Sequence, residues 1–153
     1  ADEARRYRQA ETLIDQQRPY AALSILDALV QEGSSKWEVH NDLATLHFQN
    51  GLAEQALRHM RRAVELDTSG IDALLNLGRM YLLSGIPGHA LAALGEALQR
   101  RPGDATTRAV IRDAAIVIAH HDAPEEWIAA SAQLLEADIA RLRHDLDEID
   151  AKT

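Results

Sequence analysis

Seven histidines are the residues of this sequence best suited to binding a metal or moving a proton. His40 and His47 are seven residues apart and would share one face of a helix. His120 and His121 are neighbours and would point in divergent directions. The other three lack a partner at the four-residue spacing of a helical metal site: His59, His89 and His144. The spacing therefore predicts no metal site and no cofactor, and it favours partly buried core positions for His40 and His47.

No arrangement typical of an enzyme accompanies these histidines. Carboxylates are abundant, but no motif fixes a pair of them opposite an acid or a nucleophile. The segment Gly85-Ile86-Pro87-Gly88 is typical of a turn, and no phosphate-binding lysine follows it. The sequence has no cysteine, which excludes disulfides, thiol nucleophiles and cysteine-based zinc sites. We therefore expect no catalytic activity from this chain.

The excess of acidic residues argues against two classes of partner. With 16 basic and 24 acidic residues, the formal net charge is −8, which argues against nucleic acids and anionic membranes, since both attract clustered cations. No apolar run is long enough for membrane insertion. The chain begins at Ala1, which suits either removal of an export signal or excision from a longer protein. The composition, poor in lysine, is typical of a high-GC bacterium, and it leaves the bacterial cytoplasm and periplasm open.

One segment of 34 residues, from Ile71 to Asp104, shows the pattern that positions these side chains. Its first half carries an apolar stripe at helical spacing, followed by a helix-breaking glycine and a second stripe. The stripe residues and breakers are Leu74, Leu77, Gly78, Tyr81, Gly85, Ala90, Leu94, Ala97 and Pro102. The same pattern recurs 34 residues earlier, over 37–70, where small residues and the turn glycine again align: Leu43, Ala44, Gly51, Ala56 and Ala63.

This pattern resembles the tetratricopeptide repeat. The resemblance implies an all-α fold, a right-handed α-solenoid of three to four helix hairpins in a single domain over 1–153. The repeats would cover about 3–36, 37–70 and 71–104, with a degenerate unit at 105–138 where Arg112 takes a small-residue position. We expect helices near 3–16, 19–32, 37–50, 53–66, 71–84, 87–100, 105–120 and 124–149.

A long C-terminal helix is expected over about 124–149. Its apolar residues follow intervals of four and three, as in a coiled-coil seam: Ile128, Ala132, Leu135, Ile139, Leu142, Leu146 and Ile149. One interpretation is a capping helix that covers the open end of the repeat stack. The other is a dimerisation helix, which would make the protein a homodimer, or the start of a linker to a further domain.

In the family that this chain resembles, a concave face formed by the first helix of each repeat binds partner segments. Mapped onto this sequence, that face comprises Tyr7, Arg8, Glu11, Glu38, Asn41, Asp42, Thr45, Phe48, Asp72, Asn76 and Arg79. Asn76 matches the position at which relatives bond the backbone of a bound peptide. Some relatives hold a C-terminal carboxylate with a clamp of cations and asparagine. Of the corresponding positions only Asn76 fits here, because acidic residues replace the cations.

The resemblance and the charges together predict a module that binds a protein or peptide as a scaffold or adaptor. The partner segment would be neutral to basic, with apolar anchors that contact Phe48, Leu75 and Leu82. Two alternatives stay open. The chain could be a substrate-recruiting domain of a larger bacterial enzyme or exporter, such as a glycosyltransferase, a methyltransferase or a polysaccharide-export protein. It could also be a scaffold that assembles with itself.

Overall fold

The computed structural model describes residues 2–120, and among these it contains seven helices and no strand. Each helix begins and ends within one residue of its predicted range. The chain divides into two compact units, Ala1–Thr68 and Ser69–Thr153. None of the helices within residues 2–120 combines the length and the apolar character needed to cross a membrane.

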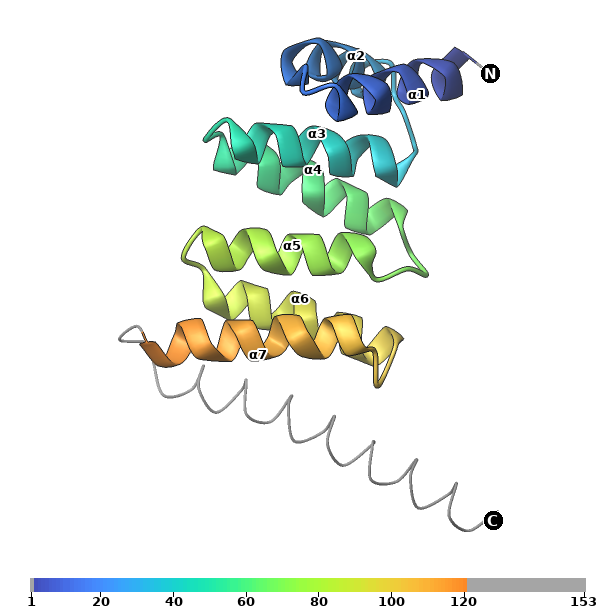
Figure 1. Cartoon of the computed structure of the whole chain (residues 1–153). Helices are drawn as coiled ribbons and strands as arrows, with labels where there is room; N and C mark the ends of the chain where they lie inside the picture. Colours follow the sequence, from blue (N-terminus) through green and yellow to red (C-terminus); the bar gives the residue numbers. More distant parts are fainter. Residues whose placement is uncertain (1, 121–153) are drawn as a thin grey trace. The chain divides into compact units, whose positions relative to one another are not determined.

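Unit 1 consists of two antiparallel hairpins. They are formed by α1 (Asp2–Asp15), α2 (Pro19–Gln31), α3 (Trp37–Gln49) and α4 (Ala53–Leu66). Figure 1 shows α1 in front of α2, and α3 in front of α4. Each helix has one apolar face and one polar face. Stacking the hairpins therefore buries apolar residues of α1, α2 and α3 in one cluster: Ala10, Ala22, Leu26, Leu29, Val39, Leu43 and Leu46.

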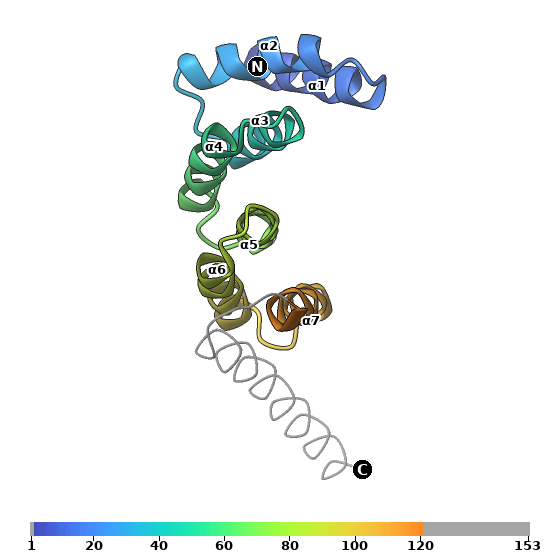
Figure 2. The same cartoon turned by 90° about the vertical axis from the view of Figure 1, so that its left-hand side faces the viewer.

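Unit 2 contains the third hairpin and the helix after it. Its helices are α5 (Asp72–Leu83), α6 (Pro87–Arg100) and α7 (Ala105–His120). α7 packs on both helices of the hairpin, and Figure 2 shows α5 and α7 on one side with α6 on the other. The most deeply buried side chains include Leu74, Leu94 and Ile111. In both units the helix that follows a hairpin packs on the second helix of that hairpin, α3 on α2 and α7 on α6.

The hairpin turns share one hydrogen-bonding pattern. At the end of α5, the amide of Ile86 donates to the carbonyl of Tyr81 at 2.9 Å across Gly85, whose φ is +76°. This six-to-one bond across a left-handed residue is the Schellman motif, which satisfies carbonyls left over at a helix end. Gly51 occupies the same place after α3 with φ +79°. After α1 the place is taken by Gln17, with φ 58°, a conformation that glycine adopts far more readily.

Small residues set the spacing within each hairpin, as the sequence predicted. In unit 1 these residues have no exposed surface: Ala10, Ala22, Ala44 and Ala56. In unit 2 a Cβ added to Gly78 would lie 2.9 Å from Leu94 Cδ2 and 3.0 Å from Leu94 Cγ. Both distances are shorter than an ordinary van der Waals contact. Gly78 therefore allows α5 to approach α6 more closely than alanine would.

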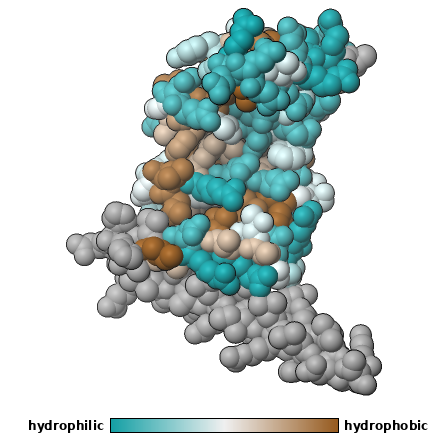
Figure 3. Space-filling view, viewed as in Figure 1, coloured by the Kyte–Doolittle hydropathy of each residue, from teal (hydrophilic) through white to brown (hydrophobic). Residues whose placement is uncertain are grey.

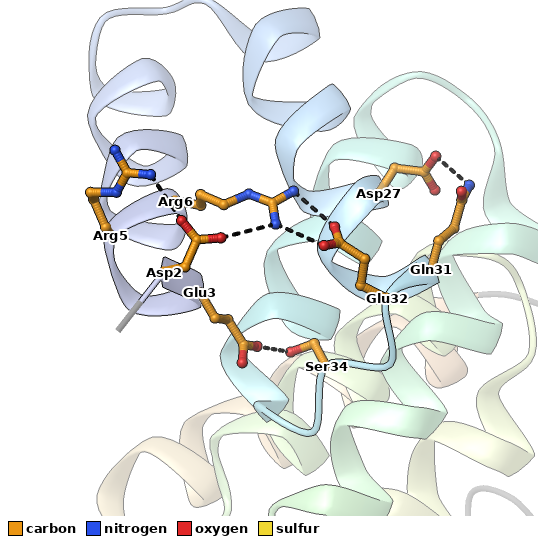
Figure 4. Close-up of polar contacts among 8 residues, drawn as sticks. All are labelled: Asp2, Glu3, Arg5, Arg6, Asp27, Gln31, Glu32 and Ser34. Carbon is orange, nitrogen blue, oxygen red and sulfur yellow. Dashed lines mark hydrogen bonds and ion pairs between the residues drawn. The ribbon is translucent and has the colours of Figure 1, made fainter.

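The first hairpin carries an ion pair where the next two have a ring or an aliphatic side chain. Arg6 corresponds in the repeat to His40 and Leu74. Its guanidinium donates to both carboxylate oxygens of Glu32, at 3.0 and 2.9 Å, and lies 3.6 Å from Asp2 (Figure 4). The hydrogen bond to Glu32 raises the pKa of Arg6 and lowers that of Glu32. Glu32 is exposed and Arg6 partly so, and solvent therefore screens this ion pair.

The predicted C-terminal helix over 124–149 lies outside the described residues. So do its seam residues and the second half of the degenerate unit at 105–138. The division of the chain into repeats, the capping interpretation and the homodimer interpretation therefore stay predictions.

Candidate functional site

Two residues of the predicted binding face meet in unit 1. Tyr7 on α1 donates a hydrogen bond from its hydroxyl to Asp42 Oδ2 on α3 at 2.6 Å. Asn41 Nδ2 lies 3.2 Å from the other oxygen of the same carboxylate. A hydrogen bond to an ionised acceptor is stronger than one between neutral groups. The contact thus brings the first helices of two successive hairpins together at their predicted binding positions.

The charges of three carboxylates act on the Tyr7 hydroxyl, and one of them, Asp42, contacts it. Burial, followed by the hydrogen bond to Asp42, raises the pKa of Tyr7, and the negative charges of Asp42, Glu11 and Glu38 add to the shift. Glu11 is exposed, and Glu38 and Asp42 are half-buried. This part of the face therefore carries a local negative charge to which a cationic side chain would be attracted.

The rest of the predicted face in unit 1 combines the polar residues Arg8 and Thr45 with the aromatic Phe48. The Thr45 hydroxyl donates to the carbonyl of Asn41 at 3.0 Å, so it is engaged with its own helix. Phe48 is half-buried and Arg8 is exposed. In Figure 3 the surface over α1 is mostly hydrophilic. A partner would meet charged and amide groups there, with one aromatic side chain close by.

In unit 2 the predicted residues lie along α5. Asp72 and Arg79 are exposed and Asn76 is half-buried. Arg79 Nη1 lies 3.5 Å from Asn76 Oδ1, so the two predicted peptide-binding side chains contact each other one turn apart. Leu75 was expected to anchor a partner, and this expectation is wrong. It is 4% exposed, because its position on α5 faces the unit's own core. Figure 3 shows apolar residues gathered over α5.

Three of the seven histidines lie in the hairpin of α3 and α4. His40 is buried and His47 half-buried, as their match to Leu74 and Tyr81 predicted. The structure adds His59 of α4, whose ring stacks on that of His47 with centroids 5.4 Å apart. Sequence spacing alone missed this contact, since it crosses the turn between two helices. Within the described residues, no group of three or more histidines and carboxylates is arranged to hold a metal ion.

Comparison with known proteins identifies the fold. No protein-family model matches the chain, and no curated protein matches its sequence significantly. Among solved structures, MamA is 18% identical with a TM-score of 0.73, and the match covers 99% of this chain and 81% of MamA. YrrB, described as a TPR protein with an unusual peptide-binding site, is 18% identical with a TM-score of 0.68, covering 96% of this chain and 72% of YrrB.

A third solved structure is that of a domain with its peptide. The second TPR domain of human RPAP3, in complex with the HSP70 peptide SGPTIEEVD, is 14% identical with a TM-score of 0.64. That match covers 71% of this chain and 91% of the RPAP3 domain. Repeated Schellman turns, small residues between paired helices and these structural matches agree. The chain has the fold of the tetratricopeptide-repeat proteins.

Proposed function

We propose that this chain is a protein-interaction module without catalysis of its own, and that it binds an extended segment of a partner protein on the first-helix face. The observation that carries the proposal is the contact between Tyr7 and Asp42. Tyr7 and Asp42 are both half-buried. The ring of Tyr7 packs against the core cluster of unit 1, and its hydroxyl meets the polar side chain of Asp42. The carboxylate, amide and hydroxyl side chains of this face can hydrogen-bond the backbone and side chains of an extended peptide.

The charges on this face favour a neutral to basic segment. The negative charges of Glu11, Glu38 and Asp42 all act at Tyr7, so an acidic tail such as the SGPTIEEVD bound by RPAP3 would be repelled there. Half-buried Phe48 and Leu82 offer apolar contacts, and Asn76 with Arg79 offers an amide and a cation in unit 2. Charge complementarity of this kind governs association rate and selectivity more than affinity.

The experiment is selection of short peptides from a display library by the purified chain, followed by measurement of Kd for the selected sequences. We expect them to carry net positive charge and at least one large apolar residue. The double variant Glu11→Lys/Glu38→Lys should weaken their binding at least about tenfold, which corresponds to about 1.4 kcal/mol. Asn76→Ala/Arg79→Glu tests the contribution of α5 in the same assay.

The matched control is Glu54→Lys/Glu65→Lys on α4, which changes the net charge equally but lies on a second helix of the same unit. Both glutamates are exposed. Binding should change less than about twofold in this control. If the α4 variant alone abolished binding, the site would lie on the second-helix face. Selection of acidic peptides would contradict the proposed charge preference.

A further inference from the structure

Three imidazole rings gather in the hairpin of α3 and α4. The centroid of His59 lies 5.4 Å from that of His47, with the rings stacked at 15°. It lies 6.3 Å from that of His40, with the rings tilted at 38°. His40 is 5% exposed, and the other two are half-buried. Charges placed on two such rings would repel each other through poorly solvated space.

The hydrogen bond of His40 shows which of its ring nitrogens carries the proton. His40 Nε2 lies 2.9 Å from the carbonyl oxygen of Ser34, which can only accept, so Nε2 carries the proton. The neutral ring then has a bare lone pair at Nδ1. Nδ1 of His40 and Nδ1 of His47 are both buried without a hydrogen-bond partner. A second proton on His40 would therefore bury an N–H without an acceptor, which is costly.

Besides the other two rings, the charged groups that act on His59 come from α4 and α2. Arg58 disfavours a proton on His59, whereas Asp27 of α2 favours one. Burial, followed by the charges of His47 and His40, lowers the pKa of His59. Asp27 accepts a hydrogen bond from Gln31 at 2.9 Å, so part of its charge is already engaged (Figure 4). Burial and the charges of the other two histidines and Arg58 together outweigh Asp27, so protonation of His59 is disfavoured.

The hairpin of α5 and α6 serves as an internal comparison. At the three corresponding positions it has Leu74, Tyr81 and Ala93, none of which gains a proton in acid. All three are buried. The fold therefore does not require histidine at these positions, and the cluster is particular to the second hairpin.

We propose that the cluster of His40, His47 and His59 is a pH-sensitive switch, which keeps α3 packed on α4 when its rings are neutral and loosens this hairpin in acid. The stability that a neutral His59 contributes is present above the usual histidine value of about 6.5 and is lost as the pH falls below it. Because α3 also carries Asn41 and Asp42, acid would disturb the binding face. This last consequence rests on the proposed function, whereas the switch itself does not.

The test is hydrogen exchange of the full chain at pH 7.5 and pH 5.5, read by mass spectrometry as protection factors corrected for the intrinsic effect of pH. We expect protection of residues 37–66 to fall several-fold relative to residues 72–100, up to about tenfold for a ring that stays neutral in the folded state. An unfolded histidine titrates near pH 6.5, so at pH 5.5 its protonated form exceeds its neutral form about tenfold. An equal change in both segments, or none, would overturn the switch. No partner is needed, so failure of the proposed function leaves this result unaffected.

The variant His40→Leu/His47→Tyr/His59→Ala copies the residues of the third hairpin. Its relative protection should change less than about twofold between the two pH values. If the triple variant does not fold, His59→Ala alone should reduce the acid-induced loss at least about threefold. His89→Ala, which removes the one histidine of α6, is the matched control and should leave the loss unchanged. Persistence of the full loss without the cluster rings would contradict the proposal.

Discussion

The Tyr7 hydroxyl lies 2.6 Å from Asp42 Oδ2 and ties the first helix of one hairpin to the first helix of the next. The two residues are 35 positions apart, one more than the repeat length. The residue equivalent to Tyr7 in the second repeat is Asn41, and Asp42 is the residue directly after it. A contact of this kind serves the stacking of hairpins and shapes the proposed binding face at the same time.

Tyr7→Phe should lower the free energy of unfolding by about 1 kcal/mol at neutral pH, because Asp42 would lose a donor in a half-buried site. The raised pKa of Tyr7 also predicts an alkaline effect. The stability contributed by the neutral phenol is complete below about pH 10 and is lost as the pH rises above it. Wild type should therefore lose stability between pH 10 and about 12, and Tyr7→Phe should lose less. Urea unfolding across this range measures both.

Tyr20→Phe is the control for this experiment, because Tyr20 is 75% exposed. Its alkaline profile should follow that of wild type. Equal alkaline behaviour of Tyr7→Phe and wild type would show that the contact with Asp42 does not govern the titration of Tyr7.

Gln17→Gly should stabilise the protein by about 0.5–1 kcal/mol, since Gln17 has φ 58° in a place where the other hairpins have glycine. The reciprocal change Gly51→Gln should destabilise by a similar amount. A Cβ on Gly51 would have no atom within 4 Å, so the cost there comes from the backbone alone. Thermal unfolding of the two variants tests the pair, and shifts of the same sign would refute the explanation.

Gly78→Ala should destabilise by about 1 kcal/mol, because the crowding against Leu94 outweighs the gain in helix propensity. Leu94 has no exposed surface, so its side chain lacks room to move aside. Adding Leu94→Met should restore most of the loss, since methionine is flexible and stands at this position in the second hairpin as Met60. A double variant no better than Gly78→Ala would place the crowding elsewhere.

Asp104 caps α7. Its Oδ2 accepts hydrogen bonds of 2.9 Å from the amide and the hydroxyl of Thr107, and the amide bond, followed by the hydroxyl bond, lowers the pKa of Asp104. Asp104→Ala should cost about 1 kcal/mol near neutral pH. The stability contributed by the ionised carboxylate is present above its usual value of 3.8 and is lost as the pH falls below it. The difference between wild type and variant should therefore shrink in acid.

Asp104→Asn separates the cap from the charge in the same titration by urea unfolding. Asparagine caps helices about as well as aspartate, so this variant should stay within a few tenths of a kcal/mol of wild type near neutral pH. A loss as large as that of alanine would show that charge, rather than the hydrogen bond, stabilises the start of α7.

Much of the fold was predictable because it depends on local spacing. Gly51 and Gly85 mark the turns, and Ala44 and Gly78 mark the close approach of paired helices. The left-handed turn at Gln17 was less evident, because glutamine carries no preference for it. The left-handed conformation of Gln17 is indicated only by the glycines at the equivalent positions of the next two repeats, Gly51 and Gly85.

The candidate site was predictable only in outline. The repeat placed Tyr7 and Asp42 on one face, but their hydrogen bond depends on how two hairpins stack. Leu75 was misplaced because adjacent positions on a helix differ by about 100°, so a small rotation moves a side chain from surface to core. The contact between His47 and His59 crosses a turn, and helical spacing within one element does not reveal it.

The order in which this protein can fold during synthesis follows from the short reach of its contacts. The pair of Arg6 and Glu32 spans 26 residues, and the bond from Arg100 to the carbonyl of Gly70 spans 30. Such contacts can form within milliseconds, whereas the ribosome adds only about 5–20 residues per second. Each hairpin can therefore close soon after it emerges. The apolar side of α2 must nevertheless wait for Val39, Leu43 and Leu46 of α3 to cover it, so the nascent chain would expose Leu26 and Leu29 until the next repeat arrives.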